Sequence, residues 1–173
     1  MKTLSEHLIQ YSHYHRVRQN ILTHFFGIPL IVIALLSFLS MPLFTISTLA
    51  ITPALLLWLG SSIFYLRLDR PLGVLMSVIN ALCLLLASWL YQLPFSLWLA
   101  GSAALFVVGW LLQFIGHYFE GRKPAFVDDL TGLIIGPLFV VTELAFILGF
   151  RQALAAEIIA ASGPVRDRSQ AKN

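Results

Sequence analysis

The sequence predicts an all-α fold, a polytopic membrane helical bundle of about five spans with an amphipathic N-terminal helical arm. Of its 173 residues, 58% are hydrophobic and only 11% are charged, whereas a soluble domain carries about 25% charged residues. The apolar residues also gather in five stretches close to the roughly 20 residues that a helix needs to cross a bilayer. The lipid bilayer is therefore the first partner that the sequence implies.

Prolines and short polar turns separate these five stretches. Pro29 stands at the start of the first and Pro71 at the start of the third, and a proline is tolerated in a first helical turn. The last stretch contains Pro137 and Glu143, so a kinked or re-entrant helix is its alternative form. The expected spans are, in order, 28–44, 47–66, 71–91, 97–118 and 130–150.

These spans give a single integral membrane domain, residues 1–155, with 1–27 as a His-rich cytoplasmic arm and 156–173 as a polar, partly disordered tail. The Lys and Arg residues of the short loops lie on the side of the N-terminus, which the positive-inside rule assigns to the cytoplasm. In a bacterium this membrane would be the inner (cytoplasmic) membrane, and in a eukaryote the endoplasmic reticulum. The net charge of +3 is too small and too scattered to indicate nucleic acid, and one cysteine excludes an intrachain disulfide.

This topology gathers the metal-binding residue types on one side of the membrane. His117 and Glu120 lie three residues apart at the end of the fourth span, and Gln113 shares their helix face. Imidazoles and carboxylates are ligands for iron, zinc and copper. The alternative is that His117 is an interfacial residue and that Glu120 pairs with Arg122. All five histidines are expected on the cytoplasmic side: His7, His13, His15, His24 and His117.

A second histidine group lies in the N-terminal arm. At 100° per residue on one straight helix, His13, Asn20 and His24 share a face and His15 points the opposite way. A break between His15 and Asn20 would reverse this result and bring His15 to His24. The alternative without a site is an amphipathic interfacial arm whose Arg and His residues contact lipid headgroups.

The two segments together resemble a known family. Residues 11–30 follow the pattern Y-x-x-x-H-x(4)-N-x(3)-H-x-x-G-x-P, and QFIGHYFEGRKPAF at 113–126 resembles the second motif of the same family, with an H-x-x-E spacing here. The family is that of the membrane 2-hydroxy fatty acid dioxygenases, typified by the fungal endoplasmic-reticulum enzyme of phytosphingosine breakdown. Members often have a proline between the first His and the Asn, where this chain has Arg18, so His13 stays an alternative to His15.

The resemblance implies an Fe(2+)-dependent α-oxidation, in which a 2-hydroxy fatty acid reacts with O2 and leaves a fatty acid one carbon shorter. It implies the metal ligands His15, His24 and His117, with Glu120 and His13 as alternates. Ligand type alone does not exclude Zn(2+). The remaining motif positions are filled by Asn20, Gly27, Pro29 and Gln113.

The chemistry of this reaction suggests further roles for charged residues near the motifs. Glu120 and Arg122 are the candidate catalytic residues, and the substrate carboxylate needs a cation, for which Arg122, Lys123 and Arg16 are candidates. The rival functions are a non-catalytic lipid-binding or scaffold protein and a small transporter. Acyl chain length and oligomeric state cannot be read from the sequence.

Overall fold

Seven helices and one short hairpin follow one another along the chain in the computed structural model, which describes residues 2–125, 129–167 and 169. These elements divide into two compact units, one of residues Met1–Ile28 with Leu111–Asn173 and the other of Pro29–Trp110. The long helices α2 (Arg18–Phe38) and α5 (Phe95–Glu120) each contribute one end to each unit. All the histidines lie in the first unit.

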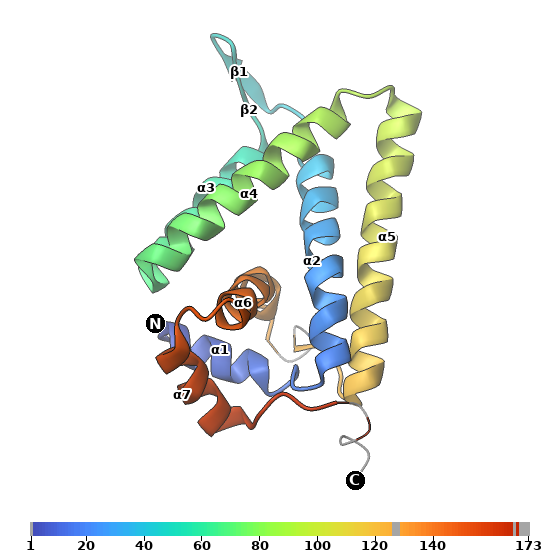
Figure 1. The fold of residues 1–173 in the computed structure, drawn as a ribbon. Helices are drawn as coiled ribbons and strands as arrows, with labels where there is room; N and C mark the ends of the chain where they lie inside the picture. Colours follow the sequence, from blue (N-terminus) through green and yellow to red (C-terminus); the bar gives the residue numbers. More distant parts are fainter. Residues whose placement is uncertain (1, 126–128, 168, 170–173) are drawn as a thin grey trace. The chain divides into compact units, whose positions relative to one another are not determined.

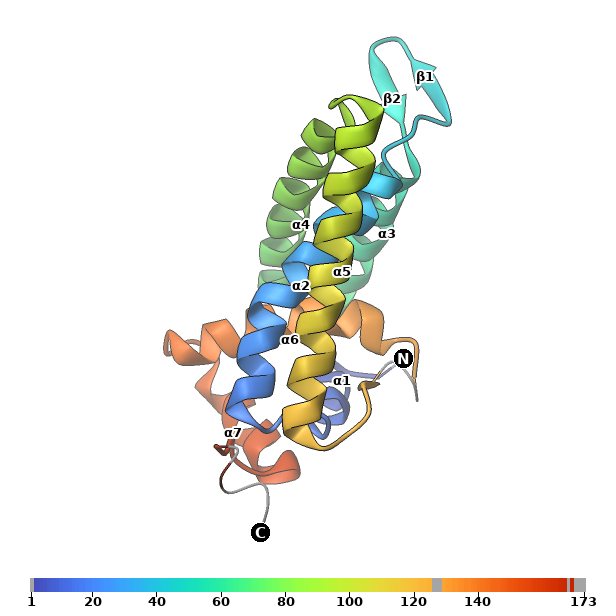
Figure 2. The same cartoon turned by 90° about the vertical axis from the view of Figure 1, so that its right-hand side faces the viewer.

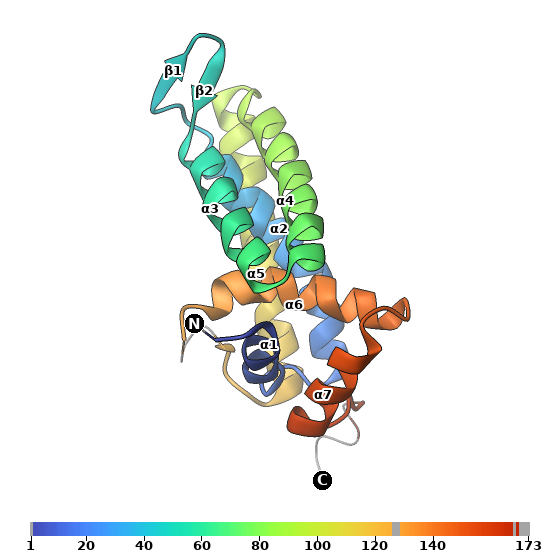
Figure 3. The same ribbon diagram turned by 90° about the vertical axis from the view of Figure 1, so that its left-hand side faces the viewer.

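The unit of Pro29–Trp110 is built around two adjacent helices, α3 (Pro53–Leu68) and α4 (Arg70–Tyr91), which lie side by side in Figure 3. Each begins with a side-chain cap: Thr52 accepts the Leu55 amide at α3, and Asp69 accepts the Leu72 amide at α4. The hairpin of β1 (Phe44–Ile46) and β2 (Leu49–Ile51) pairs in antiparallel register and precedes α3.

Small and hydroxyl residues bring the helices of this unit together. A Cβ atom on Gly73 would lie 2.6 Å from the Leu66 Cα atom, so only glycine permits α3 and α4 to approach this closely. The hydroxyls of Ser37 and Ser102 lie 2.8 Å apart and join α2 to α5, and Trp98 Nε1 donates to the Ser37 hydroxyl. Such interhelical hydrogen bonds are typical of helices packed in a membrane.

The other unit contains the short helix α1 (Leu4–Ser12), helices α6 (Gly132–Ile147) and α7 (Gln152–Ser162), and the adjoining ends of α2 and α5. Thr3 and Glu6 form a capping box at the start of α1, which fixes where this helix begins. Figures 1 and 3 show α6 crossing α1, with α7 beside it. Figure 2 shows the end of α5 running beside the start of α2.

The long apolar helices indicate a membrane protein, as the composition predicts. In the described part of the chain, α2, α4 and α5 are long and apolar enough to cross a bilayer. Helices α6 and α7 are bent by 114° relative to each other, and they would add a fourth span if together they form a single broken span. Helix α3 has 16 residues, or about 24 Å, which is short of a 30 Å hydrocarbon core. The five-span arrangement therefore stays a prediction.

Three boundaries differ from the expected ones. Helix α2 begins ten residues earlier than the predicted span 28–44, at Arg18, and Pro29 lies inside it rather than in its first turn. The hairpin occupies 44–51, where the first span was expected to end and the second to begin. Helix α7 extends to Ser162 and so covers the start of the predicted tail 156–173, while residues 168 and 170–173 of that tail lie outside the described part.

Candidate metal centre

A break in the helix places His15 in the site. Helix α1 ends at Ser12 and α2 begins at Arg18, so residues 13–17 form a connection that we call the ligand loop. The straight-helix geometry that would pair His13 with His24 therefore does not apply. His15 turns inward and is fully buried, whereas His13 caps the end of α1 and is exposed. The structure thus brings His15, not the alternate His13, to His24.

Three buried histidines from three segments meet in this unit. His15 comes from the ligand loop, His24 from α2 and His117 from α5, and one ligand atom of each lies within 4.8 Å of the others. Their ring centroids are 4.5 to 5.1 Å apart, and each pair of rings is nearly perpendicular. Among the described residues, a group of three or more His, Cys, Asp or Glu side chains close enough to share a metal ion occurs here.

Hydrogen bonds determine which nitrogens of His15 and His24 carry protons. His15 Nδ1 lies 2.8 Å from the Tyr11 carbonyl oxygen, and His24 Nδ1 lies 2.9 Å from the Asn20 carbonyl oxygen. Because a carbonyl only accepts, each Nδ1 must donate its N–H. In neutral rings both Nε2 atoms then carry lone pairs, and these two atoms face each other across 3.0 Å.

Two facing lone pairs repel unless a cation lies between them. Burial, together with His24 and His117 nearby, holds the pKa of His15 well below its usual value, so a protonated ring is disfavoured. Two nitrogens bound to one ion at about 2.1 Å and at right angles are about 3.0 Å apart. The His15–His24 pair therefore fits two ligands of one metal ion, each oriented by a backbone carbonyl as metal-binding histidines usually are.

Helix α5 carries two buried polar atoms that have no hydrogen-bond partner among the described residues. His117 Nδ1 is buried and has no hydrogen-bond partner among the described residues. The same holds for Gln113 Nε2, which lies one helical turn before His117. A buried polar group without a partner costs about 1–3 kcal/mol. One ring nitrogen of His117 lies within 4.8 Å of ligand atoms of His15 and His24 and is suited to be a third metal ligand. A donor set of three neutral imidazoles fits iron or zinc.

Glu120 accepts hydrogen bonds from the ligand loop and from α2. Its carboxylate accepts the backbone N–H groups of Arg16, at 3.0 and 3.1 Å, and of Val17, at 2.8 Å. It also accepts Asn20 Nδ2 at 3.0 Å. The first amides of a helix lack intrahelical acceptors, and a negative charge at this end is favourable. Glu120 thus holds the start of α2 and the ligand loop against the end of α5.

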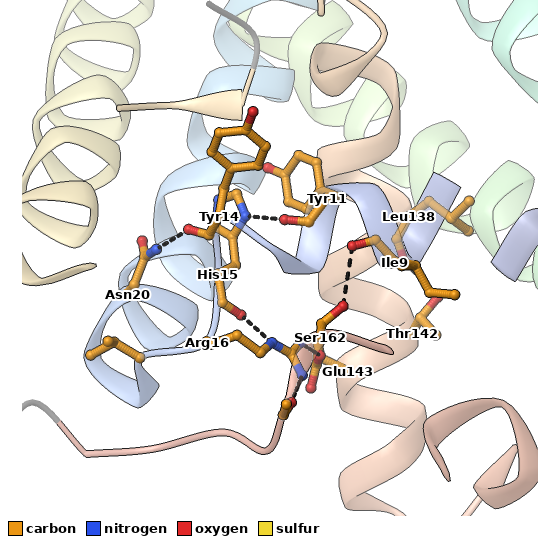
Figure 4. A network of polar contacts seen from close by, with 12 residues as sticks. Ile9, Tyr11, Tyr14, His15, Arg16, Asn20, Leu138, Thr142, Glu143 and Ser162 are labelled. Carbon is orange, nitrogen blue, oxygen red and sulfur yellow. Dashed lines mark hydrogen bonds and ion pairs between the residues drawn. The ribbon is translucent and has the colours of Figure 1, made fainter. Parts of the chain in front are cut away.

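Asn20 and a glycine bring α2 and α5 into direct contact here. Asn20 is fully buried and also donates to the Tyr14 carbonyl, which ties α2 to the ligand loop (Figure 4). Gly116 lies opposite, and a Cβ atom at this position would collide with Asn20 Oδ1 and Thr23 Oγ1. Asn20, a predicted motif residue, therefore acts through helix contact, and Gly116 has an equally direct structural role.

Tyr11 is a site residue that the sequence analysis did not assign. Its ring stacks on His15, with centroids 4.1 Å apart and planes within 2°, and it also contacts Phe139 of α6. Its carbonyl accepts the His15 Nδ1–H group. The Y-x-x-x-H spacing contained this residue, but its contact with His15 depends on the turn that follows the end of α1 at Ser12.

The cations proposed for the substrate carboxylate have unequal surroundings. Arg122 and Lys123 are exposed, and Arg122 Nη1 donates to the His13 carbonyl at 2.8 Å. Arg16 is buried and its guanidinium is engaged within the protein, at 3.1 Å from Glu143 and 3.3 Å from the Gly163 carbonyl (Figure 4). Of the other motif residues, Gly27 is buried in α2, and Pro29 lies in the other unit.

A small pocket, with a volume of about 10 Å³, lies beside the site on the side of α1 and α6, where Tyr11, Tyr14 and Asp129 contribute to its wall. The Thr131 backbone N–H group lowers the pKa of Asp129, so this carboxylate stays ionised at neutral pH. A pocket of this volume has room for about one water molecule and not for the carboxyl head of a fatty acid. The exposed Arg122 and Lys123 are therefore better placed for a carboxylate than this pocket is.

Two comparisons with known proteins give matches over most of the chain. A family model described as "2-hydroxy-palmitic acid dioxygenase Mpo1-like" matches residues 1–148. The chain is 35% identical over 152 residues to the 2-hydroxy-palmitic acid dioxygenase MPO1 of Saccharomyces cerevisiae, an alignment that covers 86% of this chain and 83% of the yeast protein. No solved structure matches. The three histidines and Glu120 all lie within the matched residues, and the chain belongs to the Mpo1-like family of 2-hydroxy-palmitic acid dioxygenases.

Proposed function

We propose that this protein is an Fe(2+)-dependent dioxygenase that converts 2-hydroxy fatty acids to fatty acids one carbon shorter, at the cytoplasmic face of a membrane. The observation that carries the proposal is the buried triad of His15, His24 and His117, with two facing Nε2 atoms 3.0 Å apart. The name of the yeast relative supports the class of substrate, and the apolar helices support the membrane setting.

The reaction balances without an external reductant. A 2-hydroxy fatty acid and O2 give the shorter fatty acid, carbon dioxide and water. The bond between the carboxyl carbon and the hydroxyl-bearing carbon breaks, and oxidation of these two carbons supplies the four electrons that reduce O2. The protein therefore has to bind substrate, metal and O2 together and to keep competing water out.

The three histidines would hold the metal, and the residues around them fix their orientation. Tyr11 and Asn20 accept the Nδ1–H groups of His15 and His24, which keeps both Nε2 atoms available as ligands. Glu120 fixes the ligand loop through the Arg16 and Val17 amides and so acts as a positioning residue. Iron, when bound by three imidazoles with positions left open, supplies the binding and activation of O2.

Two kinds of group would receive the polar end of the substrate. Arg122 would attract the carboxylate, since its guanidinium follows directly on the end of α5 and bonds the protein only through the Nη1 contact with His13 that the structure describes. The Gln113 amide would donate to a substrate oxygen, because its Nε2 is buried with no partner among the described residues. Arg16 is not proposed for this role, because its guanidinium is bound to Glu143 and to the Gly163 carbonyl.

Metal content and turnover of the purified protein test the proposal together. The wild-type protein, loaded with Fe(2+) without oxygen, should consume O2 with 2-hydroxypalmitate and form pentadecanoate, while palmitate should give neither. The variants His24→Ala and His117→Ala should lose the metal and the turnover. A protein that contains no metal after loading would contradict the proposal. A protein that binds zinc but not iron would contradict the assignment of iron as its metal.

A further inference from the structure

The chain beyond α7 lies against the ligand loop. Arg166 N–H donates to the Arg16 carbonyl and the Arg18 N–H donates to the Arg166 carbonyl, both at 2.9 Å. Val17 and Arg166 thereby form a short parallel bridge. We call residues 163–166 the clamp segment. It provides an acceptor for the Arg18 amide, next to the two amides that Glu120 accepts.

The Arg16 side chain makes a second connection to the clamp segment. Its Nη1 donates to the Gly163 carbonyl at 3.3 Å, and its Nε donates to the His15 carbonyl at 3.0 Å. Its Nη2 forms an ion pair with Glu143 at 3.1 Å, and both side chains are buried. One guanidinium thus joins the backbone of a ligand histidine to α6 and to the clamp segment (Figure 4).

The clamp segment is itself anchored to this unit. The Ser162 hydroxyl donates to the Ile9 carbonyl of α1 at 3.3 Å, and Ala155 and Ile158 of α7 are buried. Gly163 has φ +81°, a conformation that favours glycine, and it turns the chain from the end of α7 toward the ligand loop. The position of the clamp segment therefore depends on packing of α7 and on one glycine turn.

We propose that the clamp segment positions His15 for metal binding. The ligand loop is short, and Glu120 holds its backbone from α5 while Arg166 and Arg16 hold it to the clamp segment. A ligand held in place before the ion arrives binds it more tightly, because less conformational freedom is lost on binding. The clamp segment lies beyond residues 1–148, to which the family match extends. The inference rests on the proposed metal centre.

The test compares two variants of the full chain at one position. Arg166→Pro removes the N–H group that donates to the Arg16 carbonyl, whereas Arg166→Ala keeps it and removes the exposed side chain. Co(2+), added alone to the metal-free protein, is the probe, because its absorption bands report the ligand set. Hydrogen exchange of the ligand loop in the metal-free protein is the second measurement. Arg166→Pro should bind Co(2+) about tenfold more weakly than Arg166→Ala, as expected for one lost hydrogen bond.

The other expected results separate positioning from general stability. The Co(2+) bands should change in Arg166→Pro, exchange of the ligand loop should become faster, and exchange of α4 should not change. Equal Co(2+) affinity and spectra in the two variants would overturn the inference, even if exchange differed, and would leave the metal centre intact. Failure of the wild-type protein to bind any metal would overturn the proposed function, and the positioning role would fall with it.

Discussion

At the scale of single residues, His13 and His15 have opposite surroundings although they lie two positions apart. His15 is fully buried beside His24 and His117, and His13 is exposed. His15→Ala should therefore abolish stoichiometric metal binding, while the matched variant His13→Ala should retain it. Elemental analysis of both purified variants measures this. Metal loss in His13→Ala with retention in His15→Ala would contradict the assignment of ligands.

Glu120 should matter for stability as well as for the site. Glu120→Gln replaces one acceptor oxygen by an NH2 group that faces the Arg16 and Val17 amides. The loss of a buried, charged acceptor should lower the free energy of unfolding by about 1–3 kcal/mol. Unfolding by denaturant of the metal-free protein measures it. Glu157→Gln, on the exposed face of α7, is the control and should change stability by less than about 0.5 kcal/mol.

The burial of His15 predicts a loss of stability in acid. Its pKa in the folded protein lies well below 6.5, the value expected when it is unfolded. Below pH 6.5 the unfolded chain therefore binds a proton that the folded chain does not, and the stability falls as the pH decreases toward the folded pKa. Metal-free protein should unfold more easily at pH 5.5 than at pH 7.5. His15→Gln should show a smaller difference in stability between these two pH values. An unchanged difference would contradict the assignment of this pH dependence to His15.

At the scale of elements, the close contact of α2 and α5 depends on Gly116. Gly116→Ala places a Cβ atom against Asn20 and Thr23 and should push apart the helices that carry His24 and His117. Gly60→Ala in α3 is the matched control, because nothing lies within 4 Å of its added Cβ atom. Alanine is favoured over glycine by about 1 kcal/mol in a helix interior. Thermal unfolding should show a lower midpoint for Gly116→Ala and an equal or higher one for Gly60→Ala.

The boundaries of the elements were predicted less well than their existence. Pro29 and Pro71 looked alike as starts of helices, but only Pro71 lies in a first turn, because α2 begins at Arg18. A break between His15 and Asn20 is the condition that the sequence sets for His15 to join the site, and helical periodicity alone cannot establish it. The structure has the break at residues 13–17. The bonds that stabilise the break come from Glu120 and Arg166, which are more than 100 residues away.

At the scale of the whole molecule, the apolar surface of the long helices predicts stable membrane integration. Only 11% of an 18-residue apolar stretch of α5 is buried within the protein, and only 33% of the corresponding stretch of α4 is buried. Exposed apolar area on this scale is rare in soluble proteins. The protein should stay in the membrane fraction after extraction with alkaline carbonate and leave it with detergent. Release by carbonate would contradict membrane-spanning helices.

The sequence alone determined the class of molecule and the family resemblance, because composition, apolar run length and motif spacing are properties of the chain itself. It also singled out His24 and His117. The tertiary structure brought His15 rather than His13 to His24, gave Glu120 its backbone partners, and paired the Arg16 guanidinium with Glu143. These outcomes depend on contacts between distant segments, since a loop's direction and a carboxylate's partners are set by what packs against them.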